Sequence, residues 1–136
     1  MAEVIARIAT AVIALVLVAG FAIELHAHDE LASAAKVAVQ AHPARITVDK
    51  QLDAMKSIEK LRPGSDPFLA AAALDFRVRR FADAARQARR ATEREPKNFS
   101  AWVTLAVARA QVGDTAGARA AYAKAHVLNP FYPIPR

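Results

Sequence analysis

The chain has no cysteine and only four glycines among its 136 residues. Without cysteine it can form no disulfide, no thiolate metal site and no cysteine nucleophile. The scarcity of glycine, together with abundant alanine, leucine, arginine and glutamate, favours helix, because these residues lose little conformational entropy in a helix whereas glycine loses most. No segment has a convincing strand pattern. We therefore expect one modest all-α domain.

Residues that carry catalysis are also scarce. The only serines, at positions 33, 57, 65 and 100, have no histidine and acid placed as a nucleophile would need, and there is no glycine-rich phosphate loop. Imidazole and carboxylate groups gather only at His26, His28, Asp29 and Glu30, where a polar boundary explains them without a metal. We expect no enzyme, no cofactor and no metal site.

Acidic residues are outnumbered by basic ones, 13 to 19, which gives a formal net charge of +6. This excess favours acidic partners or anionic surfaces. Aromatic residues make up 7% of the chain and are not interleaved with the arginines. Because single-stranded nucleic acid is bound by bases stacking on such aromatics, we do not expect a nucleic-acid partner.

Charged residues are absent from Ile8 to Ile23. Extended to Val4 and Leu25, this apolar stretch has 22 residues and as a helix would span roughly 33 Å, close to a hydrocarbon core of ~30 Å. It is apolar around its whole circumference, whereas a soluble helix shows a polar stripe. We predict a transmembrane anchor in residues 1–27. The alternatives are a cleaved signal peptide and a buried core helix.

Lysine and arginine are nearly balanced around this segment, with Arg7 and the amino terminus before it and Lys36 and Arg45 after it. Long domains cross membranes with little regard to charge. We therefore expect a single-pass protein of the cell membrane with its C-terminal part outside the cytoplasm.

A regular frame recurs in the C-terminal half. Pro130 and Trp102 have counterparts one interval upstream, at Pro96 and Phe68. Small residues of the second helix keep the same frame, at Ala84, Ala91, Ala118 and Ala125. This pattern resembles the tetratricopeptide repeat, whose period is 34 and whose signature is W-x2-L-G-x2-Y, then A-x3-F, then P. The second copy here reads W-V-T-L-A-V-A-R, then A-R-A-A-Y, then P.

The resemblance implies a short α-solenoid of antiparallel helix pairs, with repeats at 65–98 and 99–132 and a tail at 133–136. Gly113 and Asp114 would form the turn inside the second pair, and Ala106 and Ala118 would lie at its helix crossing. The departures are Arg109, where an aromatic is usual, and Asp75 and Ala88 at packing positions of the first repeat. We expect the first repeat to pack more loosely.

Residues 28–64 hold a degenerate version of the same unit. Apolar residues with helical spacing, Leu52, Met55, Ile58 and Leu61, are followed by Pro63 and resemble a second helix of a pair. The preceding residues 30–43 would be its first helix. We expect this linker or capping pair because a repeat cannot bury its apolar face alone.

The family's concave surface is lined by the first helix of each repeat, which here is mainly apolar. A carboxylate clamp is not expected, because only one basic residue is suitably placed. The resemblance implies binding of an amphipathic or extended apolar protein segment, although the same residues could pack on the chain's own helices. The predicted groove consists of Leu69, Ala73, Phe76, Arg77, Val103, Val107, Ala110 and Gln111.

A row of arginines, Arg86, Arg90 and Arg94, follows i, i+4 spacing in the first repeat. It is either a basic patch for an anionic partner or a solvated face diluted by nearby acids. The layout as a whole resembles small membrane-bound tetratricopeptide proteins of bacteria. We expect a membrane-anchored adaptor or scaffold that assembles a membrane or envelope complex; the alternative is a structural subunit buried in a larger membrane oligomer, with self-association.

Overall fold

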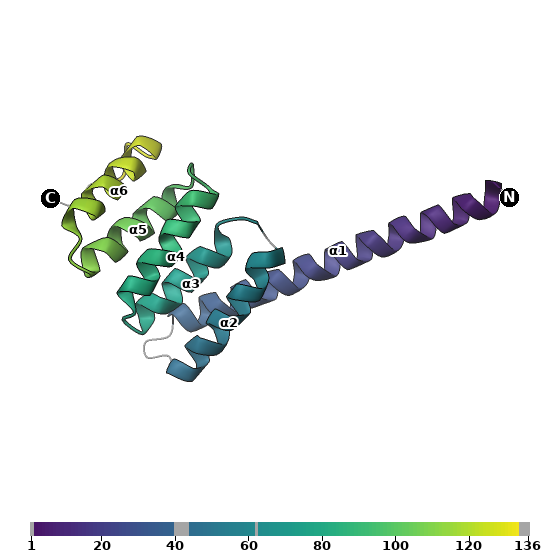
Figure 1. The fold of residues 1–136 in the computed structure, drawn as a ribbon, viewed down its shortest axis with the longest axis horizontal. Coiled ribbons are helices and arrows are strands. Elements are labelled where there is room, and N and C mark those ends of the chain that lie inside the picture. The colour runs from purple at the N-terminus through teal and green to yellow at the C-terminus, as the bar shows by residue number, and fades with distance from the viewer. Residues whose placement is uncertain (1, 40–43, 62, 134–136) are drawn as a thin grey trace.

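The computed structural model describes the backbone of residues 2–39, 44–61 and 63–133 and the side chains of residues 16–38, 44–61 and 63–133. These residues form helices and no strand, so the predicted all-α class is confirmed (Figure 1). The helices are α1 (Ala2–Val39), α2 (Arg45–Leu61), α3 (Asp66–Arg77), α4 (Phe81–Arg94), α5 (Phe99–Gln111) and α6 (Thr115–Leu128).

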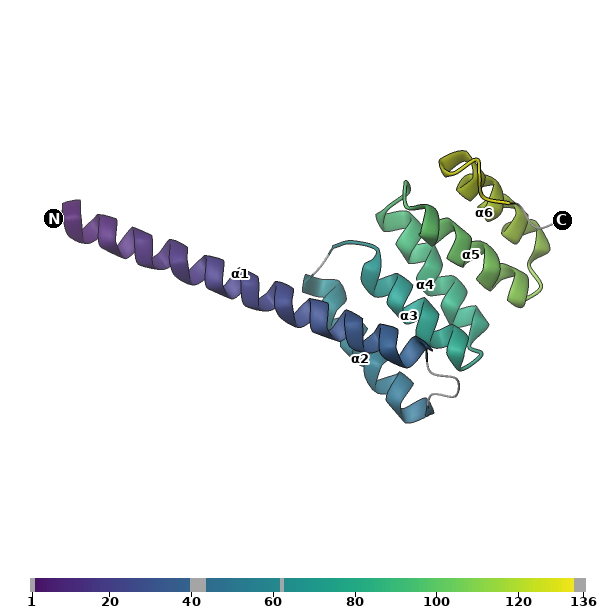
Figure 2. The ribbon, with the colours of Figure 1, turned by 180° about the vertical axis from the view of Figure 1, so that it is seen from behind.

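Helix α1 corrects the prediction of a membrane anchor in residues 1–27. It is one helix of 38 residues whose first part projects from the rest of the protein and whose last part lies against α2 and α3 (Figures 1 and 2). The side chains of residues 1–15 lie outside the described part. In the described part of the chain, none of the helices meets the length and apolarity that a membrane span requires. This finding contradicts the predicted transmembrane helix at Val4–Leu25.

The end of α1 belongs to the core instead. Ala27 and Ala34 are fully buried and Val37 is 7% exposed, in a cluster with residues of α2 and α3 that includes Ile58 and Leu74. Alanine at this crossing lets the helix backbones approach closely. The alternative of a buried core helix concerned Val4–Leu25, and it is wrong for the described side chains of that segment. Between residues 16 and 25 the large apolar side chains are exposed: Val16, Leu17, Val18, Phe21, Ile23 and Leu25.

The helices stack side by side in chain order, each antiparallel to the next (Figure 1). Residues 78–80 connect α3 to α4, and residues 112–114 connect α5 to α6. Helix α3 contacts α1, α2, α4 and α5, so it is the central element of the stack. Cavities beside α3 are therefore shared by several helices.

The backbone repeats at the interval that the sequence indicates. Residues 78–80 and 112–114 make equivalent turns, in which Arg79 (φ 61°) and Gly113 (φ 83°) take the same left-handed conformation. The N–H of Arg80 donates to the carbonyl of Asp75 at 2.8 Å, and its counterpart one repeat later, the N–H of Asp114, donates to Arg109 at 2.9 Å.

Hydrogen bonds that end one helix and begin the next recur in the same way. Their donors in the first repeat are the N–H groups of Val78, Arg79, Arg80, Ala84, Glu95 and Asn98, and in the second those of Val112, Gly113, Asp114, Ala118, Asn129 and Tyr132. The two helix pairs therefore have the same backbone design.

Alanine dominates the core between α3, α4, α5 and α6. Apart from Leu105, its buried members are Ala72, Ala84, Ala88, Ala106, Ala108 and Ala121. Larger side chains, among them Trp102 and Tyr122, pack around this cluster and are only partly buried. Ala106 and Ala118 are 0% and 5% exposed, as predicted for small residues at a helix crossing.

A polar junction joins the start of α3 to the end of α4. The Glu95 carboxylate accepts hydrogen bonds from the N–H and the hydroxyl of Ser65, both at 2.8 Å, and from the Asn98 amide at 3.1 Å. Ser65 is fully buried. These bonds hold the pKa of Glu95 below its ordinary value. The junction holds together the two ends of the helix pair formed by α3 and α4.

The tail covers part of the last pair. Tyr132 packs edge-on against Phe99 of α5, with ring centroids 4.9 Å apart, and its carbonyl lies 3.3 Å from Nδ1 of His126. Phe131 points away and is 97% exposed. The predicted tail at 133–136 lies outside the described residues apart from Pro133.

Candidate functional site

The residues of the predicted groove lie on α3 and α5, two helices that contact each other. Leu69 and Phe76 are partly buried against the chain's own core clusters, so part of this face serves internal packing. Ala73, Val103 and Val107 are also half-buried. The edge of the face is exposed, at Arg77, Ala110 and Gln111. The face is therefore a shallow apolar surface with an exposed rim.

The three arginines of the predicted basic patch already have partners within the chain. Arg86 pairs with Asp83, and Arg90 pairs with Glu59 of α2. The guanidinium groups of Arg90 and Arg94 also lie over the ring of Phe68, at 4.6 and 5.8 Å from its centroid. These contacts connect α4 to α2 and α3 and partly neutralise the row, which weakens it as an anion site.

The histidines at positions 26 and 28 are exposed on α1, as is Asp29 beside them. Within the described side chains, no group of three or more histidine, cysteine, aspartate or glutamate residues is placed to hold a metal ion.

A groove that the sequence did not indicate runs between α2 and α4. These two helices do not approach each other closely, and α3 forms the floor between them. At one end is a cavity of about 380 Å³, and at the other a cavity of about 220 Å³. Leu52, Lys56 and Gln87 line both cavities, so the two cavities adjoin.

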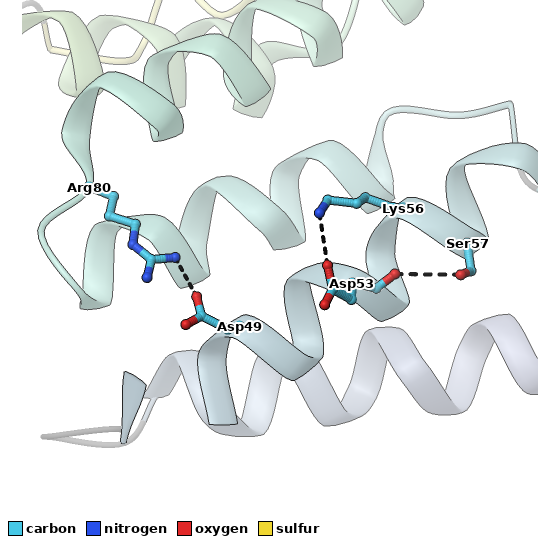
Figure 3. Close-up of polar contacts among 5 residues, drawn as sticks. All are labelled: Asp49, Asp53, Lys56, Ser57 and Arg80. Carbon is cyan, nitrogen blue, oxygen red and sulfur yellow. Dashed lines mark hydrogen bonds and ion pairs between the residues drawn. The ribbon is translucent and has the colours of Figure 1, made fainter. Parts of the chain in front are cut away.

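Ion pairs line the larger cavity, and Figure 3 shows the two that involve α2. Arg80, from the turn after α3, reaches Asp49 of α2 at 2.5 Å, and Lys56 pairs with Asp53 at 2.8 Å. The hydrogen bond from Arg80 lowers the pKa of Asp49, and Asp53 raises the pKa of Lys56. On α4, Asp83 pairs with Arg86. Three carboxylates of the lining are thus matched by three basic side chains.

Asp75 is the remaining acid of this lining. It is 2% exposed, yet its carboxyl group has no hydrogen bond or ion pair with any residue of the described chain. Burial raises its pKa to about 6, and the nearby charge of Asp83 adds to the shift, whereas Arg80 and Arg86 oppose it. The residue is buried, but its carboxyl group lines the cavity and is left without a basic partner there.

Comparison of the two repeats explains why Asp75 lacks a basic partner. The equivalent of Asp75 in the second repeat is Arg109, and the equivalent of Arg80 is Asp114. Arg109 pairs with Asp114 at 3.7 Å and donates to the carbonyl of Gly117. In the first repeat the acidic and basic residues are exchanged. Arg80 does not pair with Asp75, however, but with Asp49 of α2. The exchange was visible in the sequence; the direction of Arg80 was not.

Comparison with known proteins gives no family for this chain: no protein-family model, curated protein or solved structure matches it.

Proposed function

We propose that the protein is an adaptor built on tetratricopeptide-like repeats, which binds a segment of another protein. The main support is that the same turns and hydrogen bonds recur from one helix pair to the next. Their interval and the helix-turn-helix unit are those of that repeat family. Stacked units of this kind present long surfaces rather than a reaction centre, which suits binding.

The partner segment would lie on the face of α3 and α5. Ala73, Val103 and Val107 are half-buried there, next to the exposed polar side chains of Arg77 and Gln111 at the rim. A segment that covers these apolar side chains would remove apolar surface from water, at ~25 cal/mol per Å². An amphipathic helix or an extended apolar segment has the matching chemistry.

Site-specific photo-crosslinking in cells tests this face. A crosslinker in place of Val103 or Ala110 should yield the same discrete protein adduct, because both positions lie on the face. The control position is Ala120, which is exposed on α6. Glutamate at Val103 and Val107 should weaken binding of the purified adduct partner at least tenfold, whereas Ala120→Glu should not. Adducts of equal yield at all three positions would contradict the proposal.

A structural subunit within a larger assembly is the second candidate. It is favoured by the exposed apolar side chains of α1, which include Leu17 at 67% and Phe21 at 71% exposed. Such side chains are normally covered in a complete assembly. Light scattering of the purified chain separates the two: a stable oligomer that is lost on Leu17→Glu and Phe21→Glu supports the subunit, and a monomer supports the adaptor. The expected location at the cell membrane stays a prediction.

A further inference from the structure

The cavity at Asp75 contains a negative charge that the protein itself does not neutralise. The other acids that line it are each paired, Asp49 with Arg80, Asp53 with Lys56 and Asp83 with Arg86. Asp75 is the least exposed residue of the lining, at 2%, and it has no bonding partner among the described residues. With all seven groups ionised, the lining carries four negative and three positive charges.

We propose that this cavity binds the basic side chain of a partner segment that lies along the groove between α2 and α4. The ammonium group of a lysine or the guanidinium group of an arginine would pair with the Asp75 carboxylate. This surface is distinct from the face of α3 and α5. A failure of either proposal would therefore leave the other unaffected.

An organic cation fits the lining better than a metal ion does. No metal-holding group exists among the described residues, and the three other carboxylates already have basic partners. An ammonium or guanidinium group needs only one unpaired carboxylate together with neighbouring acceptors. The volume of about 380 Å³ is enough for such a side chain and is within the range of ligand cavities.

The adjoining cavity indicates a peptide segment rather than a free amine. It adjoins the first and is lined by the apolar side chains of Met55, Phe68 and Ala71 together with the charged side chains of Lys56, Glu59 and Arg90. In an extended segment, residues i and i+2 point to the same side. A basic residue in the first cavity would therefore place an apolar residue two positions away over the second. A free amine would leave this apolar surface uncovered.

Binding should depend on the ionisation of Asp75. The charged groups facing it are Asp49, Asp53 and Lys56 from α2, Arg80 from the turn, and Asp83 and Arg86 from α4. Its pKa of about 6 in the free protein means that it is mostly ionised at neutral pH and mostly neutral at pH 5. A bound cation would favour the ionised form and lower this pKa.

The test is a titration of the full chain with acetyl-Lys-Ala-Leu-amide at about pH 7.5, followed by NMR or calorimetry. The matched control peptide has norleucine in place of lysine, which keeps the length and removes the charge. We expect the lysine peptide to bind at least about tenfold more tightly than the norleucine peptide, and n-butylammonium to bind more weakly than the lysine peptide. Equal binding of the two peptides would overturn the proposal, as would no binding of the lysine peptide at about 10 mM.

Two variants place the effect at Asp75. Asp75→Asn has almost the same shape and removes only the charge, and it should weaken lysine-peptide binding at least about tenfold. Glu93→Gln, an exposed acid of α4 outside the groove, should leave binding unchanged. Equal loss in both variants, or none in Asp75→Asn, contradicts the proposal. If Asp75→Asn does not fold, carboxyl NMR of the unmodified chain decides: the peptide must lower the pKa of Asp75 by at least about one unit.

Discussion

Replacing Glu95 with alanine should cost about 2–3 kcal/mol of unfolding free energy. Its carboxylate accepts three hydrogen bonds, two from Ser65 and one from Asn98. Hydrogen bonds to charged groups contribute roughly 1.5–3 kcal/mol each when buried. Glu95 is itself only partly buried, so we count less than the full sum. The alanine variant also leaves the N–H of fully buried Ser65 without its acceptor, which costs about 1–3 kcal/mol.

Urea denaturation at pH 7, followed by circular dichroism and by the fluorescence of Trp102, measures this loss. The indole N–H of Trp102 donates to the carbonyl of Pro96 at 2.8 Å, so its emission reports on the same region. The control is Glu93→Ala, which removes only an exposed i, i+4 pair with Arg89. We expect that control to lie within about 0.5 kcal/mol of the unmodified chain. A loss below about 1 kcal/mol for Glu95→Ala would refute the reasoning.

The same variant makes a prediction about pH. The pKa of Glu95 is lower in the folded chain than its ordinary value of 4.5, because Ser65 and Asn98 donate to the carboxylate. The folded state therefore favours the ionised form. Its contribution is fully present above pH 4.5 and is lost as the pH falls through the folded pKa. The stability difference between the unmodified chain and Glu95→Ala should narrow in acid. A constant difference from pH 7 down to pH 3 would contradict this account.

Three further predictions concern other parts of the fold. Arg79→Gly should stabilise the chain by about 0.5–1 kcal/mol and Gly113→Ala should destabilise it by about 1 kcal/mol, because both positions have positive φ; urea midpoints that move the other way would exclude this. For Asp75, the folded pKa of about 6 exceeds its ordinary value of 3.8, so stability should fall by up to about 3 kcal/mol as the pH rises from about 4 through 6, and urea titrations of Asp75→Asn should show no such fall. Tyr132→Ala should cost about 1 kcal/mol through its lost edge contact with α5, whereas Phe131→Ala, at a side chain 97% exposed, should change the thermal midpoint little; equal shifts would contradict the tail packing.

The helical class and the repeat interval could be predicted because both depend on local properties. Gly113 and the alanines at positions 106 and 118 have the conformations or burial that their positions require. The anchor prediction treated the apolar run as a separate helix, whereas it is the first part of α1, whose last part is buried against α2 and α3. The sequence does not distinguish a buried alanine from an exposed one. Ala27 and Ala34 are buried because α2 and α3 pack against them.

The groove between α2 and α4 could not be predicted for a similar reason. Asp75 was visible as an acid at a packing position, but its isolation depends on Arg80 extending to Asp49, 31 residues earlier in the chain. That choice depends on where α2 is placed, which the repeat pattern of the later helices does not determine. The sequence also could not decide whether the arginine row is free to bind an anion. Its partners Glu59 and Phe68 come from other helices, α2 and α3.

The alanine-rich core between α3 and α6 makes this half of the protein more sensitive to larger side chains than to smaller ones. Replacing one of these alanines with glycine would cost only about 1 kcal/mol. Adding even two carbons at Ala88 or Ala121, both at most 1% exposed, would instead wedge neighbouring helices apart. Evolutionary drift at these positions should therefore be confined to glycine, alanine and serine, while the larger Trp102 and Tyr122 at the margin can exchange with other bulky residues.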